Sequence, residues 1–197
     1  MPRAGLTPAA VIEAAASVAD EMGPGQLTLT AVAHRLDVAP PSLFKHVRGL
    51  PAIESGLAVL ALGELTEAAR IAIDGRNGGE GLQAFAAAYR LYAKTHPGRY
   101  AATLRAPHLD DTEHQRASQP LLRLVYAFLE GYGIRGPDAV HATRALRAAL
   151  HGFVALEASG GFGLPEDIDD SFRRLVTAMD VCLRGWPAEA STGRGGA

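Results

Sequence analysis

The sequence contains little cysteine, few aromatic residues and no long apolar run. Its single cysteine, Cys182, excludes an intramolecular disulfide. Aromatic residues make up only 6% of the 197 residues, so alanine, leucine and valine must fill most of a core, and alanine favours helix over strand. No stretch reaches the roughly 18 apolar residues of a membrane span, and residues 1–5 lack the apolar run of a secretory signal. These absences predict a globular protein of the cytoplasm with no membrane partner.

The sequence also lacks an excess of charge of either sign. The net charge is −2 at pH 7, and four basic side chains balance four acidic ones within the first fifty residues. A non-specific nucleic-acid binder is strongly basic, so this balance argues against that class of protein. A sequence-specific reader of DNA needs only a few cations placed locally, and the balance does not exclude one.

The spacing of apolar residues predicts helices throughout the chain. Thr7 is a suitable N-cap, and Pro8 suits the first turn of a first helix. Thr28 is expected to cap a short second helix, and Pro40 is tolerated in the first turn of a third helix that ends at His46 or Val47. Further helices are expected at about residues 50–73, 82–96, 99–104, 113–132, 137–159 and 168–183. No segment has the two-residue period of a strand, so the predicted fold is all-α.

The second and third predicted helices, with the tight turn between them, have the lengths of a helix-turn-helix. In such a unit the second helix enters the major groove and presents polar side chains from its N-terminal end. Leu43 and Val47 have the spacing of buried positions, which leaves Ser42, Lys45 and His46 to contact bases or phosphates. By periodicity alone, a helical hairpin without a nucleic-acid role fits equally well.

A specific order of residues supports the DNA-binding interpretation. The run from Leu27 to Val47 reads LTLTAVAHRLDVAPPSLFKHV and resembles the N-terminal signature of the TetR family of transcriptional repressors. The resemblance begins in the first helix and continues into the helix that starts at Leu50. It implies a homodimer that binds double-stranded operator DNA. The expected DNA contacts are Thr28, Thr30, Pro40, Pro41, Ser42, Phe44, Lys45, His46 and Arg48.

Two of these residues depart from the family pattern. Pro40 stands in place of a base-reading residue and offers only apolar contact, for example to a thymine methyl group. Phe44 stands where the family usually has tyrosine, so a hydrogen bond from a phenol to a phosphate is absent. We therefore expect few direct hydrogen bonds to bases and a strong dependence on the spacing of the two half-sites.

The resemblance also implies that the larger helical body binds a small-molecule effector. The run from Leu150 to Phe153, followed by Phe172 and Leu175, is similar to a subgroup whose C-terminal domain carries a Trp-His-Gly triplet, with Leu150 in place of the tryptophan. Aromatic and polar side chains at helical spacing are the candidates for the pocket wall, although each could instead be a packing residue. The candidate ligand-binding residues are Tyr89, Tyr92, His96, Tyr100, Tyr126, Phe128, Arg147 and His151.

The last two predicted helices carry an apolar stripe with small alanines, which suits a helix-helix interface between two copies of the chain. The alternative is that these residues pack only in the core of their own chain. The candidate dimer residues are Ala145, Ala149, Phe153, Leu156, Phe172, Leu175, Val176 and Met179.

The remaining signals are weaker. His108, Asp110, Asp111 and His114 could ligate a metal, but they lie in a predicted loop with few constraints, and a solvated acidic loop is the preferred interpretation. No catalytic constellation is present, so we expect neither enzyme activity nor a metal or other cofactor. The predicted domains are a DNA-binding head (6–48), an effector-binding and dimerisation body (49–185) and a flexible tail (186–197).

The sequence therefore predicts a ligand-responsive transcriptional repressor that binds a palindromic operator as a homodimer. The helix that starts at Leu50 connects the head to the body and is expected to carry the ligand-induced change. The alternative is a helical protein that binds a small molecule or a partner and whose helix-turn-helix is degenerate.

Overall fold

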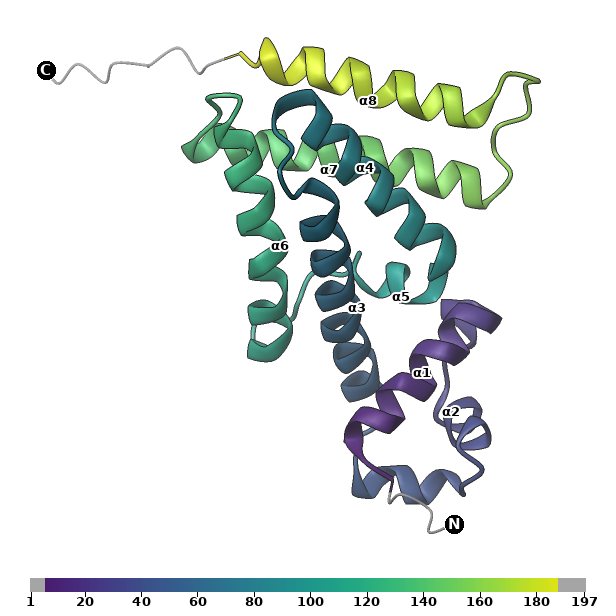
Figure 1. Ribbon diagram of the computed structural model, residues 1–197. Helices are drawn as coiled ribbons and strands as arrows, with labels where there is room; N and C mark the ends of the chain where they lie inside the picture. Colours follow the sequence, from purple (N-terminus) through teal and green to yellow (C-terminus); the bar gives the residue numbers. More distant parts are fainter. Residues whose placement is uncertain (1–5, 188–197) are drawn as a thin grey trace, which may run out of the picture. The chain divides into compact units, whose positions relative to one another are not determined.

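The computed structural model describes residues 6–187, in which helices are the only regular secondary structure (Figure 1). This confirms the predicted all-α fold. The helices are α1 (Pro8–Met22), η1 (Pro24–Gln26), α2 (Leu29–Arg35), η2 (Pro40–Lys45), α3 (Leu50–Ile73), α4 (Gly78–Thr95), α5 (Pro97–Ala102), α6 (Thr112–Glu130), α7 (Gly136–Ala158) and α8 (Ile168–Arg184). Residues 188–197 of the predicted flexible tail lie outside the described residues.

Both predicted N-caps are present at the starts of α1 and α2. The Thr7 hydroxyl oxygen accepts the Ala10 N–H at 3.1 Å, and the Thr28 hydroxyl oxygen accepts the Ala31 N–H at 3.1 Å. Each bond satisfies a backbone donor that the first turn of a helix leaves without a partner. The first and second helices therefore begin where the sequence places them.

The turn from α2 to η2 depends on a residue with left-handed backbone geometry. Asp37 has a φ of 52°, which aspartate tolerates better than most side chains. The Val38 N–H then donates to the Ala33 carbonyl at 3.0 Å, and the Asp37 N–H donates to the His34 carbonyl at 3.1 Å. This pattern closes the end of α2 and fixes the direction in which η2 leaves it.

The predicted third helix is present as η2, but it is a 3₁₀ helix rather than an α-helix. Pro40 and Pro41 occupy its first turn and have no N–H groups to donate. The first bond is the short-range one from the Ser42 N–H to the Ala39 carbonyl, at 2.8 Å. In this tighter helix, residues three apart lie above one another, which decides which side chains share a row.

The described residues form two compact units. One contains residues 6–68 and 91–121, and the other contains residues 69–90 and 122–187. This division differs from the predicted boundary at residues 48 and 49, because α5 and the start of α6 belong with the helix-turn-helix in the first unit. The functional division into a DNA-binding head and an effector-binding body stays a prediction.

The core of the first unit begins in the helix-turn-helix and extends into α3. Leu43 of η2 and Ile53 of α3 have no exposed surface, and they pack in one cluster with residues of α1 and α2. Burial of such aliphatic side chains supplies most of the stability of a small helical unit. The buried members of this cluster are Val11, Ala14, Ala15, Val32, Ala33, Leu43, Val47 and Ile53.

A glycine allows α5 to approach α1 closely. A Cβ atom on Gly98 would lie 2.1 Å from the carbonyl carbon of Ala19 and 2.3 Å from its oxygen, distances that no side chain can adopt. Ala16, Ala19 and Leu57 form a second buried cluster beside this contact. The close approach of these two backbones explains why α5 belongs to the first unit.

In the second unit, α7 packs against α8 through aromatic side chains. The rings of Phe153 and Phe172 meet edge to face with centroids 5.0 Å apart. The guanidinium of Arg90 in α4 lies over both rings and forms ion pairs with Glu157, at 2.6 Å, and with Asp169, at 2.7 Å. The hydrogen bonds that Arg90 donates to Glu157 are the first cause of the raised pKa of Arg90.

Candidate nucleic-acid interface and an adjoining pocket

The nine predicted DNA contacts, here called the DNA face, are available at the surface. Phe44 is 59% exposed although it is a large aromatic residue, whereas Leu43 beside it is fully buried. Ser42 and His46 are half-buried, and the others are exposed. An exposed aromatic side chain next to polar residues is typical of a binding surface. The members of the DNA face are Thr28, Thr30, Pro40, Pro41, Ser42, Phe44, Lys45, His46 and Arg48.

The 3₁₀ geometry of η2 arranges the DNA face in two rows. Ser42 and Lys45 are three residues apart and form a polar row, whereas Pro41 and Phe44 form an apolar row. His46 is three residues after the buried Leu43, which accounts for its partial burial. The polar side chains of η2 that can reach bases, Ser42 and Lys45, therefore share one row.

The cations of the DNA face are free of acidic partners. Lys45 and Arg48 form no ion pair within residues 6–187, whereas Arg35 in α2 is held by both carboxylate oxygens of Glu21 in α1. Because Arg35 is paired with Glu21, its positive charge does not compete with Lys45 and Arg48 for DNA phosphates. The positive charge that remains lies on the surface that the sequence assigns to DNA.

Behind the helix-turn-helix, a polar cluster ties α1 to α3, α4 and α5. Arg99 lies at its centre, with Nη1 2.7 Å from Glu64 Oε1 and its backbone N–H donating to Asp20 Oδ1 at 2.9 Å. Arg99 Nε lies 3.0 Å from Asp20 Oδ2 as an ion pair, but its N–H is not directed for a hydrogen bond. The Tyr92 hydroxyl donates to Glu64 Oε2 at 2.8 Å, and His96 Nδ1 lies 3.4 Å from Asp20 Oδ2.

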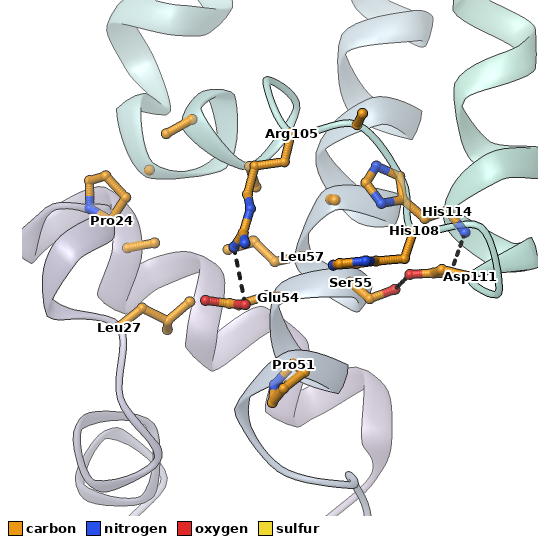
Figure 2. Close-up of a pocket in the computed structure, with 16 residues that line it drawn as sticks. Pro24, Leu27, Pro51, Glu54, Ser55, Leu57, Arg105, His108, Asp111 and His114 are labelled. Carbon is orange, nitrogen blue, oxygen red and sulfur yellow. Dashed lines mark hydrogen bonds and ion pairs between the residues drawn. The ribbon is translucent and has the colours of Figure 1, made fainter.

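The same unit contains a pocket of about 170 Å³ next to this cluster (Figure 2). Its walls come from α1, η1, α3, α5 and the loop that leads into α6. Glu54 and Arg105 form an ion pair at 3.2 Å on one side. On the other side the Asp111 carboxylate accepts the Ser55 hydroxyl and, at 2.9 Å, the His114 backbone N–H. None of the eight predicted ligand-binding residues lines this pocket.

The sequence signal near this pocket is the run of metal-capable residues His108, Asp110, Asp111 and His114, of which His108, Asp111 and His114 line the pocket. No group of three or more His, Cys, Asp or Glu side chains within residues 6–187 is arranged to hold a metal ion. Asp111 instead caps the start of α6, and the hydrogen bond from Ser55 is the first cause of its lowered pKa. The expected loop is therefore an ordered corner of the pocket.

The comparisons with known proteins decide the family. An HTH-type transcriptional regulator of Bacillus subtilis, YobS, is 38% identical over 172 residues, which cover 86% of this chain and 88% of that protein. The regulator Rv0681 of Mycobacterium tuberculosis is 33% identical and is covered to 82%. A family model described as the tetracyclin repressor-like C-terminal domain matches residues 82–179. The chain belongs to the TetR family of transcriptional regulators.

Solved structures show the same fold. A protein from Rhodococcus sp. RHA1 has a TM-score of 0.72 at 24% identity, covering 93% of this chain and 97% of that one. A TetR variant from Acinetobacter baumannii AYE, in complex with minocycline, has a TM-score of 0.70 at 22% identity, covering 93% and 99%. The predicted family and fold are thus confirmed, while the Trp-His-Gly subgroup stays a prediction.

The candidate ligand residues of this TetR regulator are divided between the two units. Tyr92, His96 and Tyr100 belong to the first unit, where Tyr92 and His96 take part in the Arg99 cluster. Burial and the bond to Glu64 raise the pKa of Tyr92, so its hydroxyl stays a neutral donor. Tyr89, Tyr126, Phe128, Arg147 and His151 belong to the second unit.

Within the second unit, Phe128 lines a small gap between α3, α4, α6 and α7. Phe85, Val125 and Leu146 are among the other residues around this gap, which has no room for a water molecule. Arg147 is exposed, and His151 is half-buried. The role of these residues in ligand binding stays a prediction.

The candidate dimer residues on α7 and α8 divide into two groups. Phe153, Phe172 and Val176 are buried within their own chain. For these three residues the structure agrees with the alternative interpretation, in which the stripe packs in its own core. Leu156 is 49% exposed, and the others are half-buried. The second group remains available for a TetR dimer interface, namely Ala145, Ala149, Leu156, Leu175 and Met179.

Proposed function

We propose that this TetR regulator is a repressor that binds a palindromic operator as a homodimer and releases it when a small molecule binds. It acts in the cytoplasm and has no catalytic activity of its own. Within residues 6–187 no helix is both long and apolar enough to span a bilayer. Relatives are named as HTH-type transcriptional regulators, and one structural neighbour was solved with minocycline.

One observation carries the DNA-binding part of the proposal. Lys45 and Arg48 are exposed and without an ion pair among the described residues, directly beside the buried Leu43 that fixes η2 on the core. Lys45 can reach a guanine edge or a phosphate, and Arg48 can contact the phosphate backbone. Ser42 adds one short polar contact, while Pro41 and Phe44 offer apolar contact only. Such a surface derives much of its specificity from binding two half-sites about 34–36 Å apart.

Homodimerisation is proposed through the exposed part of α7 and α8. Leu156 is a large apolar residue exposed on α7, and Ala145 and Ala149 are small enough to let a second helix approach. The effector then acts by favouring a conformation in which the two recognition helices no longer match the half-site spacing. It can do so only if it binds the two conformations with different affinity.

The DNA-binding part is tested with the double variant Lys45→Ala/His46→Ala. Fluorescence anisotropy on the DNA upstream of the chain's own coding region should show saturable binding by the wild type, with two protomers per site. The double variant should lose at least about 3 kcal/mol of binding free energy, the scale of one or two base or phosphate contacts. Its circular dichroism should remain that of the wild type, because both side chains lie outside the core.

The matched control is Arg135→Ala/His141→Ala, which also removes one cation and one histidine from exposed positions, here at the start of α7. It should bind the DNA like the wild type. If both double variants bound the DNA with the affinity of the wild type, η2 would not be the recognition helix. If both double variants lost DNA binding, the attraction would be purely electrostatic.

A further inference from the structure

The pocket between the helix-turn-helix and α5, here called the His108–His114 pocket, has no role in the function proposed so far. It lies wholly within the unit of residues 6–68 and 91–121. We infer that this pocket is an effector site for a single-ring aromatic carboxylic acid, whose binding lowers the affinity of the recognition helix for DNA. The regulatory half of this inference rests on the proposed repressor function, whereas the ligand-binding half does not.

The size of the pocket limits the ligand to about one ring. A dry protein cavity of about 150 Å³ holds one benzene molecule, and this pocket measures about 170 Å³. Small side chains create the space, because Ala19, Ala58, Ala101 and Ala102 all lie along it. Leu57 adds an apolar surface that is almost fully buried. A flat ring suits this part of the wall better than a long or branched chain.

The polar side of the pocket contains a histidine that lacks a hydrogen-bonding partner. His114 is only 6% exposed, yet its imidazole forms no hydrogen bond or ion pair with any residue from 6 to 187. Figure 2 shows the imidazoles of His108 and His114 directed into the pocket. Among the described residues only Arg99 Nε is a buried side-chain nitrogen without a hydrogen bond, so the imidazole nitrogens of His114 are accessible from the pocket, where a ligand acceptor can bond to them.

The donors around the pocket favour an oxygen acceptor on the ligand. His108 and His114 each offer a ring N–H, and Arg105 has guanidinium donors beyond the one that Glu54 occupies. The Asp111 carboxylate accepts the Ser55 hydroxyl and the His114 backbone N–H, and among the described residues it forms no hydrogen bond with either imidazole. A ligand carboxylate can accept two or three of these bonds at once, which a phenol or an alcohol cannot.

The walls of the pocket explain how the ligand would reach the DNA face. One side is formed by Ala19 at the end of α1 and by Leu27, which packs against the core of the helix-turn-helix. The other side is formed by α5, which touches α1 backbone to backbone at Gly98. A ring held between α1 and α5 would alter the direction of α1 and, through the shared core, of η2. The coupling follows if the ligand prefers the altered arrangement.

The test uses benzoate as the probe and the full chain without DNA. Titration to about 10 mM, followed by the imidazole signals of the seven histidines in NMR spectra, should give saturable shifts of His108 and His114. The variant His114→Phe keeps a ring of similar shape and should bind benzoate roughly tenfold more weakly, because one charge-assisted hydrogen bond is lost. His108→Ala, at an exposed position where folding is not at risk, should also weaken binding.

The control is His141→Ala on α7, an exposed histidine outside the pocket, which should bind benzoate like the wild type. Toluene, which has the ring without the carboxylate, should bind the wild type more weakly than benzoate does. Absence of shifts at His108 and His114, or equal affinity for toluene and benzoate, would overturn the ligand assignment.

A second arm measures DNA binding in the presence of saturating benzoate. The DNA affinity of the wild type should fall by roughly tenfold, and that of His114→Phe should change less. Benzoate binding at the histidines without any change in DNA affinity would overturn the regulatory half. Absence of DNA binding in all conditions would overturn the proposed repressor function and leave the pocket assignment standing, because that was measured without DNA.

Discussion

Arg90 lies near the end of α4 and Arg99 lies in α5, and each is the centre of an ion-pair cluster in a different unit. Arg90 lies over two phenylalanine rings and pairs with Glu157, and both of these charged side chains are 12% exposed. Arg99 instead bonds to Asp20 and Glu64, which come from two other helices, and has no aromatic ring beneath it in the described contacts. Similar side chains thus serve different purposes, because one closes a core and the other joins the helix-turn-helix to the helices behind it.

The difference concerns what each arginine holds in place. The Arg90 cluster joins α4 to α7 and α8, and none of its members belongs to the helix-turn-helix. The Arg99 cluster includes Asp20 of α1, so a change there acts directly on the element that supports η2. Loss of Arg90 should therefore reduce stability alone, whereas loss of Arg99 should reduce both stability and DNA binding.

The largest expected effect is that of Arg90→Met. Removal of the guanidinium takes from the largely buried Glu157 carboxylate both hydrogen bonds that Arg90 donates, which should lower the free energy of unfolding by about 3–5 kcal/mol. Urea denaturation followed by circular dichroism measures the change. Arg174→Met, which breaks an exposed pair with Asp170, should leave the stability unchanged. If the two variants were equally stable, the Arg90 cluster would not stabilise the packing of α4 with α7 and α8.

Arg99→Met should have a smaller effect on stability and a larger effect on DNA binding. We expect a loss of about 3 kcal/mol in unfolding free energy, at the lower end for a buried pair, because Tyr92 still donates to Glu64. DNA affinity, measured by anisotropy at a temperature where the variant is folded, should fall because α1 loses its tie to α5. Arg90→Met is the comparison. Equal DNA affinity of the two variants would refute the assigned difference between the clusters.

The smallest effects are expected from removing one hydroxyl in each unit. Tyr92 donates to Glu64, and Tyr132 donates to Asp180 at 2.7 Å, so Tyr92→Phe and Tyr132→Phe form a matched pair. Each should cost about 1 kcal/mol or less in unfolding free energy, because the carboxylate keeps an arginine partner. Only Tyr92→Phe should alter DNA affinity, and an equal change in both would contradict the link between Tyr92 and the DNA face.

Local signals in the sequence predicted the helices and the outward side of the recognition element. Thr7 and Thr28 cap the helices that they were expected to cap, because a cap depends on residues three positions away. The burial of Leu43 and the exposure of Lys45 also follow from spacing alone. The 3₁₀ form of η2 was not predicted, although Pro40 and Pro41 together remove the N–H groups of its first turn.

The sequence alone did not predict which side chains from distant helices pair with each other. Tyr92 and His96 have the spacing of a pocket wall, but their partners Glu64 and Asp20 come from other helices, and no local pattern indicates such pairs. The His108–His114 pocket was missed for a related reason. Five of its sixteen lining residues are alanines, which at helical spacing indicate ordinary packing, and only the folded chain brings them around one space.

The close contact at Gly98 has a consequence for modularity. A recombination event or an engineered chimera that joins two regulators after residue 48 would keep α1, α2 and η2 but replace the α5 that touches Ala19. Any α5 with a side chain at that position would collide with the α1 backbone. The helix-turn-helix of this chain can therefore be transplanted only together with an α5 that has glycine at this position, so the transferable unit is discontinuous in the sequence.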